Sequence, residues 1–108
     1  MREIKFRAWH KNAKCMCENA TTDLLDRDYL EFMQYTGLKD KNGTEIYEGD
    51  IVQFKNSFGG LTGVVRYYAN CKPIIDKNKR SVDIAECNEE DLEVIGNIYQ
   101  NPELLKED

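Results

Sequence analysis

Several features that would point directly to a function are missing from the 108 residues of this chain. It has a single histidine, His10, and so little material for histidine-based proton transfer. No apolar run approaches the roughly 20 residues that a membrane-spanning helix needs, and no apolar stretch follows Met1-Arg2-Glu3 as a secretory signal requires. Gly59-Gly60 lacks the Gly-Lys-Ser/Thr of a phosphate-binding loop. We therefore expect a cytoplasmic protein that is not an enzyme.

Positive charge is also scarce. The chain has 15 Lys and Arg residues against 20 Asp and Glu residues, a net charge of −5 at pH 7. This argues against a general nucleic-acid binder, because neutralising phosphates takes clustered basic side chains. Runs of one charge usually form solvated faces, although the two ends of this chain carry unlike charge and could guide self-association. The basic residues near the N-terminus are Arg2, Lys5, Arg7, Lys11 and Lys14.

Size and composition are those of an ordinary globular protein. Apolar residues make up 41% of the chain and charged residues 32%. A chain of this length can bury roughly two-thirds of its extended surface and fold without disulfides. We expect a single domain over residues 1–108.

The N-terminal segment alternates apolar and polar side chains over residues 4–9, the period-2 pattern of a half-buried strand. Residues 10–14 form a polar turn, and Cys15-Met16-Cys17 can pair back as a second strand. This predicts a hairpin over residues 2–18. The polar face of the hairpin would carry Lys5, Arg7 and Trp9.

Residues 20–34 allow two interpretations. A helix capped by Thr21 or Thr22 would gather leucine and aromatic side chains on one face. A strand over residues 30–36 would instead place Leu30 and Phe32 on one face and Met33 on the other. We favour a short helical turn followed by the strand.

From Gly37 onward, turns that contain glycine separate short apolar strands. Lys41-Asn42-Gly43 tolerates positive φ and predicts a tight reversal, and Glu48-Gly49-Asp50 turns the chain again. Gly63 indicates a bulge or bend of the kind that small barrels need. The predicted strands cover residues 51–55, 61–69, 73–75, 81–85 and 94–99. This spacing predicts a mainly β fold, for which we expect a small antiparallel SH3-like barrel over residues 46–99.

Two short helical segments complete the expected fold. Residues 89–92 form a single turn capped by Asn88. In the tail over residues 100–108, Pro102 ends the sheet, and a one-turn helix at residues 103–105 packs its leucines on the barrel.

Three blocks of the sequence resemble the YopX family of small phage and prophage proteins. The middle block is Met33-Gln34-Tyr35-Thr36-Gly37-Leu38-Lys39-Asp40 followed by Ile46-Tyr47-Glu48-Gly49-Asp50-Ile51-Val52. Residues 2–9 resemble the start of the family and residues 94–105 its end. One departure is His10, where the family usually has Asp. The resemblance implies a phage-derived, intracellular protein of unestablished activity, and it supplies no catalytic residues.

His10, Cys15 and Cys17 invite a metal-binding or a nucleophile–base interpretation, with Cys71 or Cys87 as a further ligand. The single residue between Cys15 and Cys17 is a poor match to the Cys-x-x-Cys zinc knuckle. No third residue is evident that would orient a cysteine–histidine pair. We interpret the thiols as small apolar side chains and expect neither a metal nor a cofactor.

Acidic residues in the middle block invite a metal or an acid–base interpretation as well. Asp40 and Asp50 are more simply turn residues whose carboxylates accept backbone N–H groups. Glu48 either does the same or faces solvent. We expect no catalytic role for any of the three.

Aromatic residues could stack on single-stranded nucleic acid, but most lie at strand positions that should face a core. Phe58, in a glycine-rich loop, is either an exposed contact anchor or a packed cap. Our leading hypothesis is a non-enzymatic domain that acts through protein contacts, with a host or phage partner or with further copies of itself. The alternative is a nucleic-acid-binding barrel. The candidate interaction surface consists of Arg2, Lys5, Arg7, Trp9 and Phe58.

Overall fold

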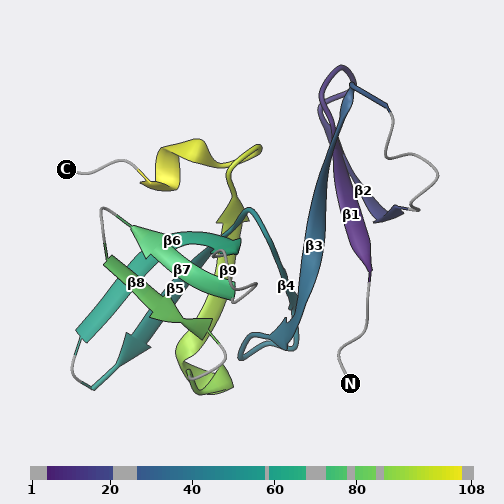
Figure 1. The fold of residues 1–108 in the computed structure, drawn as a ribbon. Coiled ribbons are helices and arrows are strands. Elements are labelled where there is room, and N and C mark those ends of the chain that lie inside the picture. The colour runs from purple at the N-terminus through teal and green to yellow at the C-terminus, as the bar shows by residue number, and fades with distance from the viewer. Residues whose placement is uncertain are drawn as a thin grey trace.

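The computed structural model describes residues 5–20, 27–57, 59–67, 73–77, 80–84 and 87–105. The expected mainly β fold is confirmed: the strands form two antiparallel sheets that lie side by side (Figure 1). Within the described ranges, helical structure is confined to short 3-10 turns, which include η3 (Glu89–Asp91) and η4 (Pro102–Leu105).

The first sheet has the strand order β2-β1-β3-β4. Its strands are β1 (Phe6–His10), β2 (Cys15–Ala20), β3 (Leu30–Lys39) and β4 (Glu45–Tyr47). The predicted N-terminal hairpin is present as β1 and β2, joined by a four-residue turn. β3 is longer than the predicted strand: its first half pairs with β1 and its second half with β4. The helical interpretation of the segment before β3 falls largely on residues 21–26, outside the described residues.

The second sheet has the order β8-β7-β6-β5-β9 and curves into a half-barrel. Its strands are β5 (Asp50–Asn56), β6 (Gly59–Tyr67), β7 (Pro73–Lys77), β8 (Arg80–Asp83) and β9 (Leu92–Asn97). All neighbours are antiparallel, and β5 pairs with both β6 and β9. In the described chain β8 and β9 are the two edges of this sheet.

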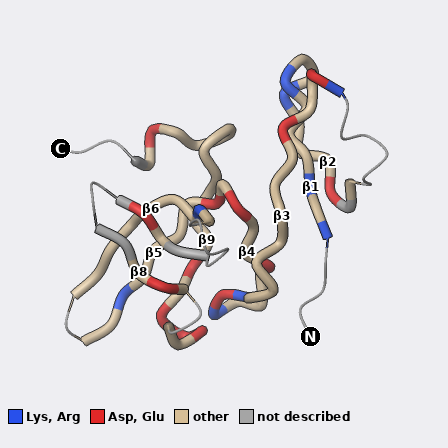
Figure 2. Tube along the Cα trace, viewed as in Figure 1, with Lys and Arg blue, Asp and Glu red and all other residues tan. Residues whose placement is uncertain are grey.

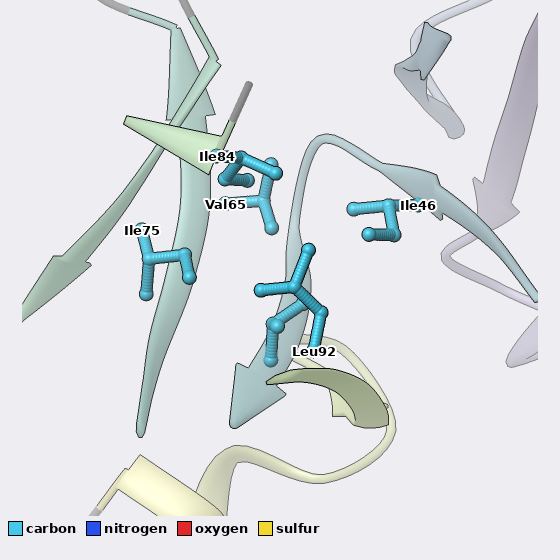
Figure 3. Close-up of a cluster of buried hydrophobic side chains, with 6 residues drawn as sticks. Ile46, Val65, Ile75, Ile84 and Leu92 are labelled. Carbon is cyan, nitrogen blue, oxygen red and sulfur yellow. The ribbon is translucent and has the colours of Figure 1, made fainter. Parts of the chain in front are cut away.

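The main hydrophobic core lies inside the half-barrel (Figure 3). Its six members are each at most 2% exposed: Ile46, Val52, Val65, Ile75, Ile84 and Leu92. Five of them come from the half-barrel segment, but Ile46 belongs to β4 of the first sheet. The core is therefore shared between the two sheets, which fixes β4 against the half-barrel.

The predicted turns and the C-terminal helix have different outcomes. The reversal before β4 is present, with Gly43 at φ +79° and its N–H bonded to the carbonyl of Asp40. Gly49 also has positive φ, at +88°. The predicted C-terminal turn is η4, but the expectation that its leucines pack on the barrel is wrong for Leu104, which is 39% exposed.

Gly63 in β6 is required by close packing rather than by its φ. A Cβ at this position would lie 2.7 Å from the carbonyl oxygen of Asp76 and 2.9 Å from the side chain of Ile75, both on the neighbouring β7. Gly63→Ala should therefore destabilise the half-barrel by about 2–3 kcal/mol, the cost of overpacking a dense interior. Urea denaturation monitored by Trp9 fluorescence and by circular dichroism measures the change.

Gly43→Ala is the control, because an added Cβ there meets no atom within 4 Å and brings only the strain of positive φ, about 1 kcal/mol. Equal losses of stability in the two variants would contradict the close-packing explanation for Gly63.

Candidate functional site

The first sheet carries a three-stranded part that extends away from the half-barrel, which we call the wing: β1, β2 and residues 30–34 of β3 (Figure 1). The register pairs Ala8 with Phe32 and with Cys17, and pairs His10 with Leu30 and with Cys15. Paired residues lie on the same face of a sheet, and successive residues of a strand alternate between faces. The wing therefore has an inner face toward the half-barrel and an outer face away from it.

The inner face of the wing packs on the half-barrel through a second hydrophobic cluster. Its buried members are Met33, Tyr35 and Tyr47, and Trp9, Met16 and Tyr99 pack against them. Trp9 stacks on Tyr99 with 5.7 Å between the ring centroids and 16° between the planes. This contact joins β1 to the segment that follows β9. The Trp9 indole is thus part of the packing between the sheets.

Arg7 joins the two sheets electrostatically. Its guanidinium forms an ion pair and a hydrogen bond with the carboxylate of Asp50, at the start of β5. The guanidinium also lies 4.6 Å from the centre of the Tyr47 ring. Arg7 is 8% exposed and Asp50 1%, and among the described residues the Arg7 Nε has no hydrogen-bond partner. The polar face predicted for β1 therefore faces the protein interior at Arg7, because a carboxylate from a segment 43 residues away covers it.

Asp50 is held in place by its own turn as well as by Arg7. Its second carboxylate oxygen accepts the backbone N–H of Tyr47 at 2.7 Å, which closes the Glu48-Gly49 turn. Burial raises the pKa of Asp50 above its ordinary value, and Arg7 and the Tyr47 N–H oppose that rise. The sequence-based interpretation of Asp50 as a turn residue agrees with this geometry.

Asp40 likewise serves the backbone. Its carboxylate accepts the N–H groups of Asn42, Thr44 and Val94, each at 2.9 Å, and the residue is 1% exposed. The first two bonds shape the reversal before β4, and the third ties that reversal to β9. Among the described contacts, each oxygen of this carboxylate is thus occupied by the fold.

His10, Cys15 and Cys17 lie on the outer face of the wing, as the register requires. The Nδ1 of His10 accepts the N–H of Ala13 at 3.0 Å, and the ring lies 4.9 Å from that of Tyr29. Burial, with a further contribution from the neighbouring Cys15, raises the pKa of Cys17. In the described part of the chain, no three His, Cys, Asp or Glu side chains converge as a metal site would need.

Three members of the candidate interaction surface lie on the inner face of the wing and contact other parts of the protein. Lys5 forms an ion pair with Glu45 at 2.5 Å and lies 5.1 Å from the centre of the Tyr35 ring. Lys5, Arg7 and Trp9 all lie on the side that contacts the rest of the protein, and so they do not form an open basic and aromatic patch. Arg2 and Phe58 lie outside the described residues.

The outer face of the wing was not selected from the sequence as a contact surface. It carries three half-buried side chains, Phe6, Leu30 and Phe32, and the rings of Phe6 and Phe32 meet edge to face with 6.3 Å between their centroids. Ala8, on the same face, is 0% exposed. Tyr29, at the end of the wing, is 38% exposed. The alternation of Leu30 and Phe32 with Glu31 and Met33 signals two faces, but it does not say which face a second layer covers.

The fold and the wing define a mainly β protein of two joined sheets, and comparison with known proteins assigns its family. The YopX protein family model matches residues 18–106, so the chain belongs to the YopX family. A similar solved structure is the crystal structure of protein EF1440 from Enterococcus faecalis, with 28% sequence identity and a TM-score of 0.61. That alignment covers 98% of this chain and 100% of the other. A search of curated proteins gives no match.

Within the described residues, no helix is both long enough and apolar enough to cross a lipid bilayer.

Removal of Arg7 tests the ion pair between the sheets. Arg7→Met should lower the free energy of unfolding by about 3–5 kcal/mol at pH 7, because it leaves Asp50 charged and buried without its cation. Adding Asp50→Asn should recover part of that loss. The cost of Arg7→Met should also shrink in acid: losing Arg7 raises the pKa of Asp50 further, so the folded variant gains stability as the pH falls and the carboxyl takes up a proton.

Urea denaturation of the two single variants and the double variant gives the coupling between the residues. Losses that simply add at pH 7, or a cost of Arg7→Met that is the same in acid, would contradict a coupled buried pair.

Tyr47 provides a test at alkaline pH. Burial, with a further contribution from Glu45, raises the pKa of Tyr47 to about 12. The folded protein therefore keeps this proton at a pH where an unfolded chain, with tyrosines near 10, has lost it. The stability that results is complete below pH 10 and is lost as the pH rises through 12. Absorbance of the phenolate should show a late step that Tyr47→Phe removes, and titration of all tyrosines near pH 10 in the folded protein would refute this.

Proposed function

We propose that this YopX-family protein is a non-catalytic, phage-derived interaction domain that self-associates through the outer face of its wing. The observation that carries the proposal is the apolar character of that face. Phe6, Leu30 and Phe32 lie on it, and none of them belongs to either hydrophobic cluster of the described structure. The opposite face already packs on the half-barrel.

A sheet with an apolar face is normally covered by a second layer. In the described part of the chain, the two clusters that bind the layers together leave the outer face of the wing out. A second copy supplies the same apolar face, so two wings related by a twofold axis would cover each other. Burial of aromatic side chains is the main contribution to such contacts.

The arrangement of the polar groups supports a binding role rather than a catalytic one. Asp40 and Asp50, the buried acids of the middle block, are engaged by backbone N–H groups and by Arg7. The Nδ1 of His10 accepts a backbone N–H in its own turn. General acid–base chemistry needs groups with an open side toward a substrate, and the carboxylates of Asp40 and Asp50 are bonded within the fold.

The nucleic-acid alternative loses support from the same geometry. Lys5 and Arg7 were two of its three basic residues, and each is paired with a carboxylate of the protein. A cation that is already paired with a carboxylate neutralises a phosphate poorly, so few counterions are released from the nucleic acid. Such side chains therefore add little affinity for nucleic acid.

Light scattering coupled to size-exclusion chromatography tests self-association. The wild-type protein should show a mass that rises from monomer to dimer with concentration. Phe32→Glu should hold the protein at the monomer mass over the same range, because it places a charge in the apolar contact. Leu30→Gln, a milder change on the same face, should weaken the dimer by about tenfold.

Gln53→Glu is the matched control, since it adds the same charge on β5 of the half-barrel, and its dimerisation should equal that of the wild type. Circular dichroism shows that each variant is folded. A wild-type protein that stays monomeric at every concentration, or a folded Phe32→Glu variant that dimerises normally, would refute the proposal.

A further inference from the structure

The half-barrel has a surface pocket of about 300 Å³, and the described residues that line it all belong to the half-barrel segment of the chain. It lies between the end of β5, the edge strand β8 and the turn η3 that leads into β9. β8 and β9 are the two edges of the half-barrel in the described chain, so the pocket lies near the open side of the sheet. We refer to it as the seam pocket.

The chemistry of the seam pocket is acidic and amide-rich around an aromatic wall. Among the described residues that line it, Asp83 and Asp91 supply carboxylates, Asn56 and Asn88 supply carboxamides, and Phe54 supplies an aromatic ring. No Lys or Arg is among these described residues. All three residues of η3 are acidic, and Figure 2 shows this acidic run at the lower end of the half-barrel. The field in the pocket therefore favours a cation.

The walls of the seam pocket are held by the core. Phe54 is half-buried and packs against the main hydrophobic core, as does Cys87. The Cys87 thiol donates to the carbonyl of Asp83 at 3.5 Å, and the Asp91 N–H donates to the carbonyl of Asn88 at 2.9 Å. Both bonds join residues that lie three or four positions apart and that line the pocket. A pocket with fixed walls can bind without first being ordered.

The size and the donor set distinguish between kinds of cation. A hard metal ion needs about six or more oxygen ligands at short range, and no such cluster of acidic groups is formed by the described residues. The volume of the seam pocket is at the lower limit for ligand pockets, and a pocket of this size suits one long side chain. A guanidinium is planar, can bond a carboxylate through two N–H groups and stacks on aromatic rings, so it suits Asp83, Asp91 and Phe54 better than an ammonium does.

We propose that the seam pocket binds an arginine side chain presented by a partner protein. The guanidinium donates to the carboxylates of Asp83 and Asp91 and to the amide oxygens of Asn56 and Asn88, and its plane lies against Phe54. The choice of a protein as the source of the arginine rests on the proposed function. The pocket itself does not, because it lies on the half-barrel and the outer face lies on the wing.

Titration of the full-length protein with acetyl-arginine-amide, followed by NMR of the backbone amides, tests the pocket. Saturable shifts should appear at the amides of Asn56, Val82, Asn88 and Asp91. Acetyl-citrulline-amide, which has nearly the same shape without the charge, should give none. Asp91→Asn should weaken binding by about tenfold, the loss expected for one hydrogen bond between charged groups.

Glu90→Gln is the matched control, because Glu90 lies in the same turn η3, loses the same charge and does not line the seam pocket. Its affinity should equal that of the wild type. Absence of saturable shifts, equal weakening by Asp91→Asn and Glu90→Gln, or equal binding of the citrulline compound would overturn the proposal. So would calcium chloride that gives the same shifts at lower concentration, since the pocket would then belong to a metal ion.

The two proposals fail separately. A protein that stays monomeric but binds acetyl-arginine-amide contradicts only self-association through the wing. A protein that dimerises through the wing but does not bind the arginine compound contradicts only the seam pocket.

Discussion

The buried pair of Arg7 and Asp50 is the constraint on which the arrangement of the two sheets depends. It joins β1 to the start of β5, with both side chains nearly inaccessible to water. Removing two charges from water is costly, and a buried pair often stabilises a protein no more than an apolar pair of the same volume. The pair does restrict how the two sheets are placed relative to each other. The Arg7 guanidinium must contact the Asp50 carboxylate and lie over the Tyr47 ring at the same time, and few relative positions of the sheets allow both contacts.

Other contacts also join the two sheets. The Tyr67 hydroxyl donates to the Tyr35 carbonyl at 3.3 Å, and Trp9 stacks on Tyr99. Ile46 enters the half-barrel core from β4. The stacking of Trp9 and the apolar contact of Ile46 are only weakly directional, so alone they would tolerate a shift of one sheet along the other. The middle block of the sequence therefore has a structural purpose, since it contains Asp50, Tyr47 and the Asp40 reversal.

The sequence predicted the elements much better than their partners. Alternation over residues 4–9 and the glycine-containing turns identified most of the strands, because these signals are local. The same alternation placed Arg7 and Trp9 on a polar face, correctly as a face but without the carboxylate and the Tyr99 ring that cover it. Those partners are about 43 and 90 residues away in the chain, and no local pattern encodes such pairings. The seam pocket was not predicted from the sequence for the same reason, since its lining comes from β5, β8 and η3, and β5 is distant in the chain from the other two.

The wing thus reverses the usual arrangement of a surface sheet. Its charged Arg7 points inward to a buried partner, while the half-buried Phe6 and Phe32 lie on the opposite face. An apolar face that is partly open to water favours association with a matching surface. Because the inner face is already specified by a directional ion pair, changes on the outer face can alter binding without moving the sheets relative to each other. One face of the short strand β1 therefore contributes to the stability of the fold, and its other face belongs to the surface that we propose for contacts.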